Sequence, residues 1–168
     1  LSASGSFTGK VRHMKIASGY GTAIFYGDFV KLVAAGTVEK SAITTAVVAG
    51  TVGIFVGCSY TDPTSNQLTF NQQFPASTAA DDIMAYVVDD PDLVFRMQGD
   101  GSIAQTGLGN NVSLVSTAGS TSIGRSKNAV DASTIATTNS LPMRIVEFVD
   151  GPSSSVGDSY TDVLVTYL

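Results

Sequence analysis

The stretch 51-TVGIFVGCSYTDP-63 decides the fold class of this chain. Its first eleven residues are rich in Val, Ile, Phe and Tyr, which favour extended backbone. It ends at Asp62 and Pro63, a pair typical of a turn. Proline has no backbone N–H, and at this position the strand no longer needs one for pairing. The segment therefore predicts a buried β-strand followed by a turn. Positions 52, 54 and 56 are aliphatic, so we expect the face centred on Ile54 to lie inside and Phe55 to lie on the opposite face.

Alternation of apolar and polar residues continues on both sides of this stretch. The further strands are expected in 23–40 (a pair broken near 34–36), in 67–74, in 83–102 (two runs around an acidic corner), and in 143–151 with 160–168 (a final pair). Helix signals are weak, and only 131–138 and 102–110 could form a turn or two. We predict an all-β protein with one domain, built as a small barrel or a sandwich.

Length and composition suggest one domain with two extensions. A chain of 168 residues is long enough to bury one core. Residues 1–22 contain small residues and basic groups and predict an N-terminal arm ahead of a β-barrel domain, 23–168. The alternative is that the arm is the first strand of the barrel. Residues 99–142 are rich in Gly, Ser, Thr and Asn without clear periodicity, which predicts a long surface excursion within the domain.

The charge pattern limits the possible partners. Only 14% of residues are charged, well below the ~25% usual for globular domains. Residues 1–40 hold five Lys/Arg and two Asp/Glu, whereas residues 41–168 hold four and twelve. The basic excess is too small for nucleic-acid binding. The longest apolar run, 46–58, is too short to span a bilayer, and no secretory signal is visible. We expect neither nucleic acid nor membrane as a partner.

The acidic corner in 85-AYVVDDPDLVFRM-97 is the main candidate for chemistry. Asp89 and Asp90 are adjacent, so on a strand their side chains would point to opposite faces. Pro91 favours extended backbone before it, and Asp/Pro clusters form turns. A calcium loop would need oxygens at alternating positions, a glycine for the sharp turn and a distal glutamate. Only the first two of those oxygens are present, and no glutamate follows. We predict a solvated turn that includes Asp92, with a weak Ca²⁺ site or a catalytic carboxylate pair as alternatives.

Other catalytic motifs are not recognisable. His13 is the only histidine, which leaves too few ligands for the usual zinc site, and no G-x-S-x-G motif is present. Cys58, the single cysteine, lies in an apolar strand and is expected to be a buried, inert thiol. We therefore expect no enzyme activity, no catalytic residues, no metal and no cofactor.

Four segments, with the motifs 26-YGDFVKL-32 and 52-VGIFVG-57 among them, carry a resemblance over nearly the whole chain. These segments are 17–40, 52–63, 85–115 and 141–168. In this order they resemble virion structural proteins of marine tailed bacteriophages, and in particular head-decoration (capsid cement) proteins. The chain departs from minimal decoration proteins chiefly through residues 99–142.

The resemblance implies a role for the protein in the virus particle. It implies a compact β-barrel or β-tulip made in the host cytoplasm and placed on the outer surface of the expanded capsid. The implied partners are the major capsid protein and neighbouring copies of the chain itself. Two other classes stay open: another virion component, such as a tail, fibre or knob module, and a host-cell hydrolase or lectin domain.

The N-terminal arm is the segment expected to bridge capsid subunits. It combines basic groups with apolar anchors and could add a strand to an exposed sheet edge of the capsid. The residues predicted to contact the capsid are Phe7, Lys10, Val11, Arg12, Met14 and Lys15.

Overall fold

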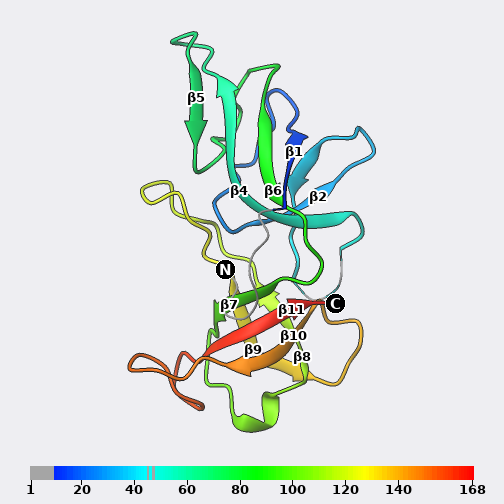
Figure 1. The fold of residues 1–168 in the computed structure, drawn as a ribbon, viewed down its shortest axis with the longest axis vertical. Coiled ribbons are helices and arrows are strands. Elements are labelled where there is room, and N and C mark those ends of the chain that lie inside the picture. Colours follow the sequence, from blue (N-terminus) through cyan, green and yellow to red (C-terminus); the bar gives the residue numbers. More distant parts are fainter. Residues whose placement is uncertain (1–9, 45, 47) are drawn as a thin grey trace.

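The computed structural model of the chain describes residues 10–44, 46 and 48–168. This part of the chain contains eleven β-strands, one short 3₁₀ turn and no α-helix, which confirms the all-β prediction. The strands form two antiparallel sheets, drawn one above the other in Figure 1. The strand pairs expected within 23–40 and around the acidic corner, the strand after residue 50 and the C-terminal pair are all present.

The first sheet has the order β1-β6-β4-β2-β3, with β5 paired to β4 beyond β2. Its strands are β1 (Val11–Lys15), β2 (Phe29–Leu32), β3 (Val38–Lys40), β4 (Thr51–Thr61), β5 (Leu68–Asn71) and β6 (Met84–Val88). The second sheet has the order β7-β11-β10-β8-β9. Its strands are β7 (Val94–Gln98), β8 (Asn111–Val115), β9 (Ala129–Ala136), β10 (Met143–Phe148) and β11 (Asp162–Tyr167), and the 3₁₀ turn is Gln105–Gly107.

β4 is the longest strand and organises the first sheet. It pairs with β6 on one side, and on the other side first with β2 and then with β5. Its register against β6 shifts between Phe55 and Gly57, a bulge that bends the strand. In Figure 1 its first half crosses above the second sheet, and its second half rises away with β5. Gly57 has φ of +150°, and a Cβ on Gly53 would lie 2.0 Å from the Val88 carbonyl oxygen, so both positions require glycine.

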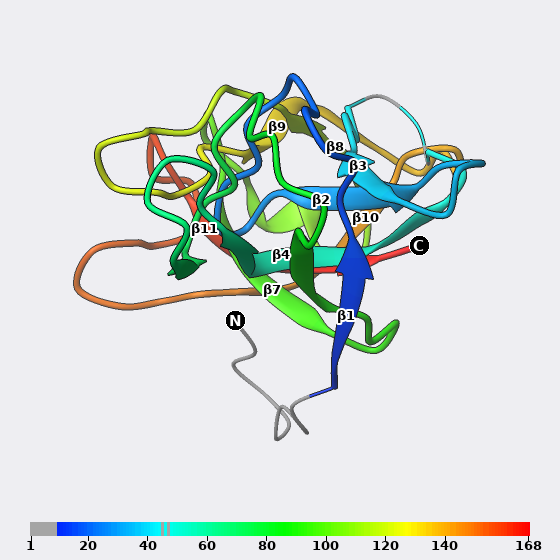
Figure 2. The ribbon, with the colours of Figure 1, turned by 90° about the horizontal axis from the view of Figure 1, so that it is seen from above.

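One hydrophobic cluster lies between the two sheets. The first sheet contributes Phe29, Ile54 and Val88. The second sheet and its flanks contribute Leu93, Phe95, Ile103, Val112, Leu114, Val130, Met143, Ile145, Val163 and Val165. The rings of Phe29 and Phe95 meet edge to face across the interface, with centroids 5.9 Å apart. In Figure 2, which is seen from above, β2 and the first half of β4 lie nearer to the viewer than β7 and β10. The cluster between them joins the two sheets into one sandwich.

A second cluster covers the other face of the first sheet. It contains Phe55, Cys58 and Val87 from the strands. It also contains Ile24 and Phe74 from the connecting segments, which pair with each other through an isolated bridge. Both faces of β4 are therefore buried. Ile54 is 7% exposed, as expected, but Phe55 is 0% exposed. The expectation that only the Ile54 face of the strand lies inside is therefore corrected, because both faces are buried.

The expected barrel is also corrected. The described residues form two open sheets and no closed barrel. The closest approach to closure is a single bridge between Gly99, which follows β7, and Val130 of β9. Because β5 and β6 follow the bent half of β4 away from the second sheet, the strands cannot join into one cylinder.

The predicted arm, 1–22, is corrected for its second half. Residues 11–15 form β1, antiparallel to β6. Met14 and Ile16 are 7% and 4% exposed and belong to the second cluster, so this segment is part of the domain. Residues 1–9 lie outside the described residues.

The predicted surface excursion, 99–142, is wrong for much of its length. It contains β8 and β9, whose Val112 and Val130 are fully buried. The segment 131–138, considered for helical turns, lies largely in β9, whereas 102–110 does contain the 3₁₀ turn. Small polar residues between the apolar ones hid the alternation, because Ser and Thr are compatible with both strands and loops.

Candidate functional site

β1 forms one edge of the first sheet. In the described part of the chain it pairs only with β6. The Asp89 N–H donates to the Lys10 carbonyl at 3.4 Å, and the Ile16 N–H donates to the Ile83 carbonyl at 3.2 Å. Even-numbered residues thus bond to β6, and in an antiparallel pair the odd-numbered ones then direct their backbone groups away. The residues whose N–H and C=O groups line this open edge are Val11, His13 and Lys15.

The β1 edge is cationic. Lys10, Arg12 and Lys15 are all exposed. Arg12 donates to the Asp89 carboxylate at 2.5 Å, with its side chain 58% exposed, and such a surface pair contributes at most about 1 kcal/mol. Lys10 and Lys15 form no ion pair with any described residue. The edge therefore offers backbone hydrogen-bonding groups together with positive charge.

The structure separates the residues predicted to contact the capsid. Val11, 38% exposed, remains accessible at the edge. Met14 is buried in the second cluster and is withdrawn from the contact set, because its side chain points toward the core. Phe7 lies outside the described residues. His13 packs edge-on against Tyr86 of β6, with ring centroids 4.7 Å apart.

The acidic corner is a turn, as predicted. The Asp92 N–H donates to the Asp90 side chain at 3.1 Å, and the Leu93 N–H donates to the Asp90 carbonyl at 3.4 Å. Asp89 is turned toward Arg12. The described residues contain no group of three or more His, Cys, Asp or Glu side chains arranged to hold a metal ion. The corner thus connects β6 to β7 and so links the two sheets.

β5 forms a second open edge, and in the described part of the chain it pairs only with β4. The Asp62 N–H donates to the Gln67 carbonyl at 2.9 Å, and the Asn66 N–H donates to the Asp62 carbonyl at 2.8 Å. Asn66 has φ of +55°, the left-handed residue of a bulged hairpin turn. From Asp62 the hydrogen-bonded pairs alternate, so Thr69 and Asn71 bond to β4 while Leu68 and Phe70 direct their backbone groups outward.

The side chains on the β5 edge are apolar and exposed. Leu68 is 62% exposed and Phe70 is 70% exposed. Two carboxylates accept hydrogen bonds at the turn end of the β4–β5 hairpin. Hydrogen bonds from the Ser65 and Thr64 backbone lower the pKa of Asp62, and the Thr61 side-chain hydroxyl, with its backbone N–H, lowers the pKa of Asp82. The sequence predicted this strand but gave no sign that its apolar residues face solvent.

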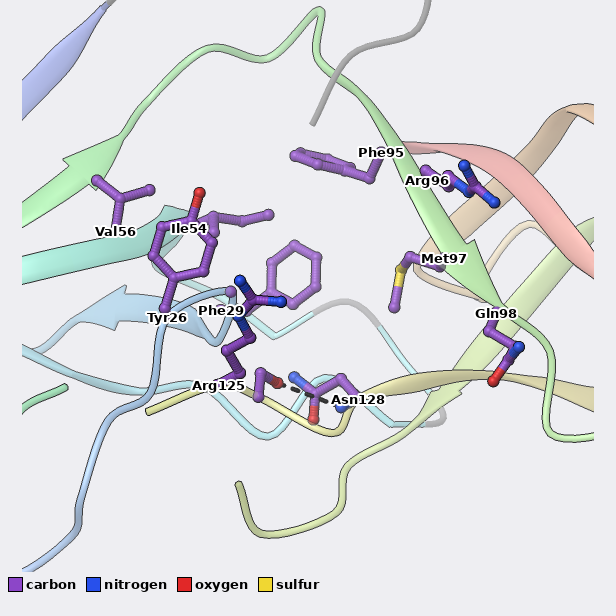
Figure 3. A pocket seen from close by; sticks show the side chains of 12 residues that line it. Tyr26, Phe29, Ile54, Val56, Phe95, Arg96, Met97, Gln98, Arg125 and Asn128 are labelled. Atoms are coloured by element: carbon purple, nitrogen blue, oxygen red, sulfur yellow. Dashed lines mark hydrogen bonds between the residues drawn. The ribbon is translucent and has the colours of Figure 1, made fainter. Parts of the chain in front are cut away.

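A crevice of about 270 Å³ opens between the two sheets (Figure 3). Its apolar wall consists of Phe29, Ile54, Val56, Phe95 and Met97. Arg96 lies at its rim but is held by Asp162 on the neighbouring strand at 2.6 Å. The crevice marks where the sandwich is incompletely closed, and it brings together no nucleophile and base.

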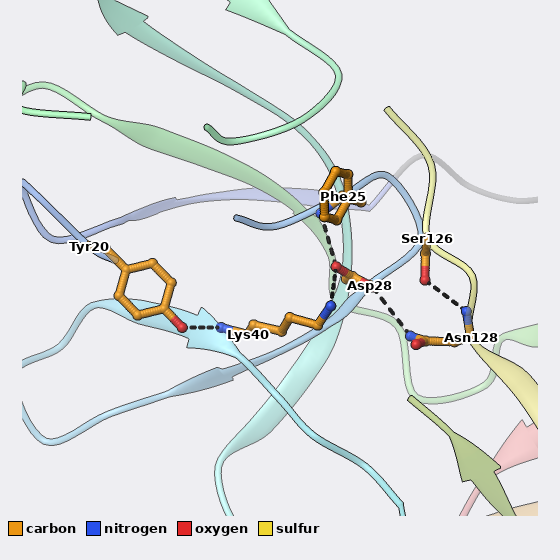
Figure 4. Close-up of polar contacts among 6 residues, drawn as sticks. All are labelled: Tyr20, Phe25, Asp28, Lys40, Ser126 and Asn128. Carbon is orange, nitrogen blue, oxygen red and sulfur yellow. Dashed lines mark hydrogen bonds and ion pairs between the residues drawn. The ribbon is translucent and has the colours of Figure 1, made fainter. Parts of the chain in front are cut away.

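A buried polar network ties the two sheets together beside this crevice (Figure 4). The Asp28 carboxylate, fully buried, accepts from the Phe25 N–H at 2.9 Å and pairs with the Lys40 ammonium at 2.9 Å. It also accepts from the Asn128 side-chain amide at 3.3 Å. Because Lys40 and the hydrogen-bond donors compensate the charge of the buried carboxylate, the network has a structural role. Removal of the Lys40 ammonium would leave the Asp28 charge buried and unpaired.

Cys58 is buried in the second cluster, and burial raises the pKa of its thiol to about 12. At neutral pH the group therefore stays protonated, so it is a poor nucleophile. The predicted burial of this thiol is confirmed.

Comparison with known proteins finds no matching family profile, no similar curated protein and no similar solved structure. Among the described residues no helix is long and apolar enough to cross a lipid bilayer. The β1 and β5 edges are two features of the described surface that could form an interaction.

Proposed function

We propose that this protein is a capsid decoration protein that binds the outside of a bacteriophage head and stabilises the expanded shell. The observation that carries the proposal is the open, cationic edge of β1, which can add to a β-strand of the major capsid protein. The low charge content of the chain and the resemblance of its segments to virion proteins support the same role.

Binding through β1 combines main-chain and electrostatic contacts. The outward N–H and C=O groups of Val11, His13 and Lys15 extend a capsid sheet by one strand, as in β-strand addition. Lys10, Arg12 and Lys15 steer the edge toward an acidic surface, which raises the association rate more than the affinity. Each contact is weak, but repetition over a symmetric shell multiplies the binding. Met14 and Ile16 hold the strand in place from the core side.

The test is co-sedimentation with expanded capsids that lack the protein. His13→Pro removes one outward N–H but leaves the even-numbered hydrogen bonds to β6 intact, so the variant is expected to fold and to lose binding. The matched control is Leu68→Pro, which removes an outward N–H from the other edge described above, the β5 edge, without breaking a hydrogen bond to β4. The variants are compared below their melting temperatures.

Charge is tested separately across a salt series. Lys10→Ser with Lys15→Ser is expected to weaken binding about 3–10-fold at low salt and to flatten its salt dependence. The control pair, Lys31→Ser with Lys127→Ser, removes the same charge from elsewhere and should bind as the parent does. Failure of the parent protein to bind expanded capsids would overturn the proposal. A handful of copies per purified particle, rather than hundreds, would favour a tail or fibre component.

A further inference from the structure

The β5 edge is short but lacks the charges, prolines and bulges that keep sheet edges apart. Residues 63–80 contain no charged side chain, and no proline occurs between Pro63 and Pro75. β5 pairs with β4 in an uninterrupted register, without a bulge. Exposed edges are normally protected by charges, prolines or bulges, because unpaired backbone groups template further pairing. An edge with exposed Leu68 and Phe70 and none of these protections is built to be covered.

Charge determines which partner suits this edge. The chain carries a net charge of −5, so two copies repel each other over most of their surface. The stretch 63–80 carries no charge, so two copies can approach along β5 without placing like charges directly opposite each other. A suitable partner for β5 is an extended, apolar and uncharged strand, and β5 of a second copy is such a strand. We propose that β5 pairs antiparallel with β5 of a second copy and joins two first sheets into one continuous sheet.

The hydrogen-bond pattern specifies the register of this dimer. A two-fold axis at Thr69 places Leu68 opposite Phe70 of the second copy, and Phe70 opposite its Leu68. Because both residues direct their N–H and C=O groups outward, each pair exchanges two hydrogen bonds. Their side chains then form two Leu–Phe contacts on one face, the kind of cross-strand pair that stabilises sheets. The interface is self-complementary, as a two-fold dimer requires.

The dimer leaves the β1 edge free. In the first sheet, β5 and β1 lie on opposite sides of the β4–β6 pair, and Figure 1 shows β5 projecting from the end of the molecule away from the second sheet. Pairing through β5 does not depend on capsid binding, and it is measurable on the purified protein alone.

The experiment is sedimentation equilibrium of the full chain over a concentration series, with amide exchange measured by NMR at low and high concentration. The parent is expected to shift toward twice the monomer mass as concentration rises. The Leu68 and Phe70 amides should gain protection with concentration, whereas those of Thr69 and Asn71 should already be protected in the monomer. A parent that stays monomeric at millimolar concentration would overturn the proposal.

Three variants distinguish strand pairing from general stickiness. Phe70→Pro removes the outward N–H without breaking the β4 ladder and should abolish the dimer. Phe70→Ala keeps that N–H and should weaken the dimer only partly. Val146→Lys, at an exposed position on β10, should dimerise as the parent does. A dimer that persists in Phe70→Pro would show that the copies associate elsewhere and would overturn the proposal.

Discussion

Two open edges of the first sheet, β1 and β5, have opposite chemistry. β1 carries three exposed cationic side chains among its residues and neighbours, whereas β5 carries none and exposes Leu68 and Phe70. Like charges oppose the pairing of two β1 strands and favour an acidic partner, while an uncharged edge allows self-pairing. Two strands of one sheet can therefore select different partners, because side-chain charge rather than backbone geometry distinguishes them.

The largest expected loss of stability comes from a substitution in β4, the strand whose core supports both edges. Phe55 lies at the centre of β4, between the strands that carry the edges, and is fully buried. Phe55→Ala should lower the free energy of unfolding by about 3–5 kcal/mol, through lost burial and the cavity left behind. Urea denaturation measures this loss, and both edges should lose amide protection together.

A matched substitution on the outside provides the control for Phe55→Ala. Val146, 42% exposed on β10, should change stability by less than about 0.5 kcal/mol when replaced by alanine. A small loss at Phe55 would mean that the two edges are not supported by a common core.

The second prediction asks whether β1 belongs to the domain. Met14→Ala should cost about 2–5 kcal/mol because its side chain is buried in the second cluster, whereas Val11→Ala at the exposed end of the strand should cost less than about 0.5 kcal/mol. Equal and small losses in thermal denaturation would restore the interpretation of this segment as an arm outside the core.

The third prediction removes the charge difference between the edges. Replacing Lys10, Arg12 and Lys15 by Ser makes the β1 edge as uncharged as the β5 edge. Like charges directly opposite each other across a strand pair are destabilising, so their removal should increase self-association. Sedimentation in the Phe70→Pro background isolates the effect from β5, and an unchanged monomer would mean that charge does not protect β1.

The smallest effect is expected from acid at the turn end of the β4–β5 hairpin, where Asp82 accepts from Thr61. Hydrogen bonds from Thr61 lower the pKa of Asp82 below its ordinary value of 3.8. A carboxyl group with a lowered pKa in the folded state stabilises it above the unfolded pKa, and this contribution is lost as pH falls through the folded value. The protection factor of the Thr61 amide, after correction for the intrinsic pH dependence of exchange, should therefore fall as the pH is lowered below about 3.8. Asp82→Asn should remove this pH dependence, while the β1 amides serve as the internal reference.

Local chemistry was readable from the sequence. Val, Ile and Phe in period two predicted β4, and the same pattern predicted the strands at both ends of the acidic corner and the C-terminal pair. The Asp/Pro cluster predicted the turn at residues 89–92, because proline and aspartate restrict the backbone locally. An apolar setting was enough to predict that Cys58 is buried. Each of these depends on neighbouring residues only.

What covers each face was decided by the tertiary structure. Alternation shows that Ile54 and Phe55 lie on opposite faces of β4, but only the segments packed from elsewhere in the chain bury both of them. The same holds for Met14, which resembled a surface anchor in a basic segment until β6 placed it over the core. Leu68 and Phe70 have the pattern of a buried strand, yet the bend in β4 carries them away from the second sheet and into solvent. A two-residue period determines which side chains share a face, whereas burial depends on contacts between segments that lie far apart in the chain.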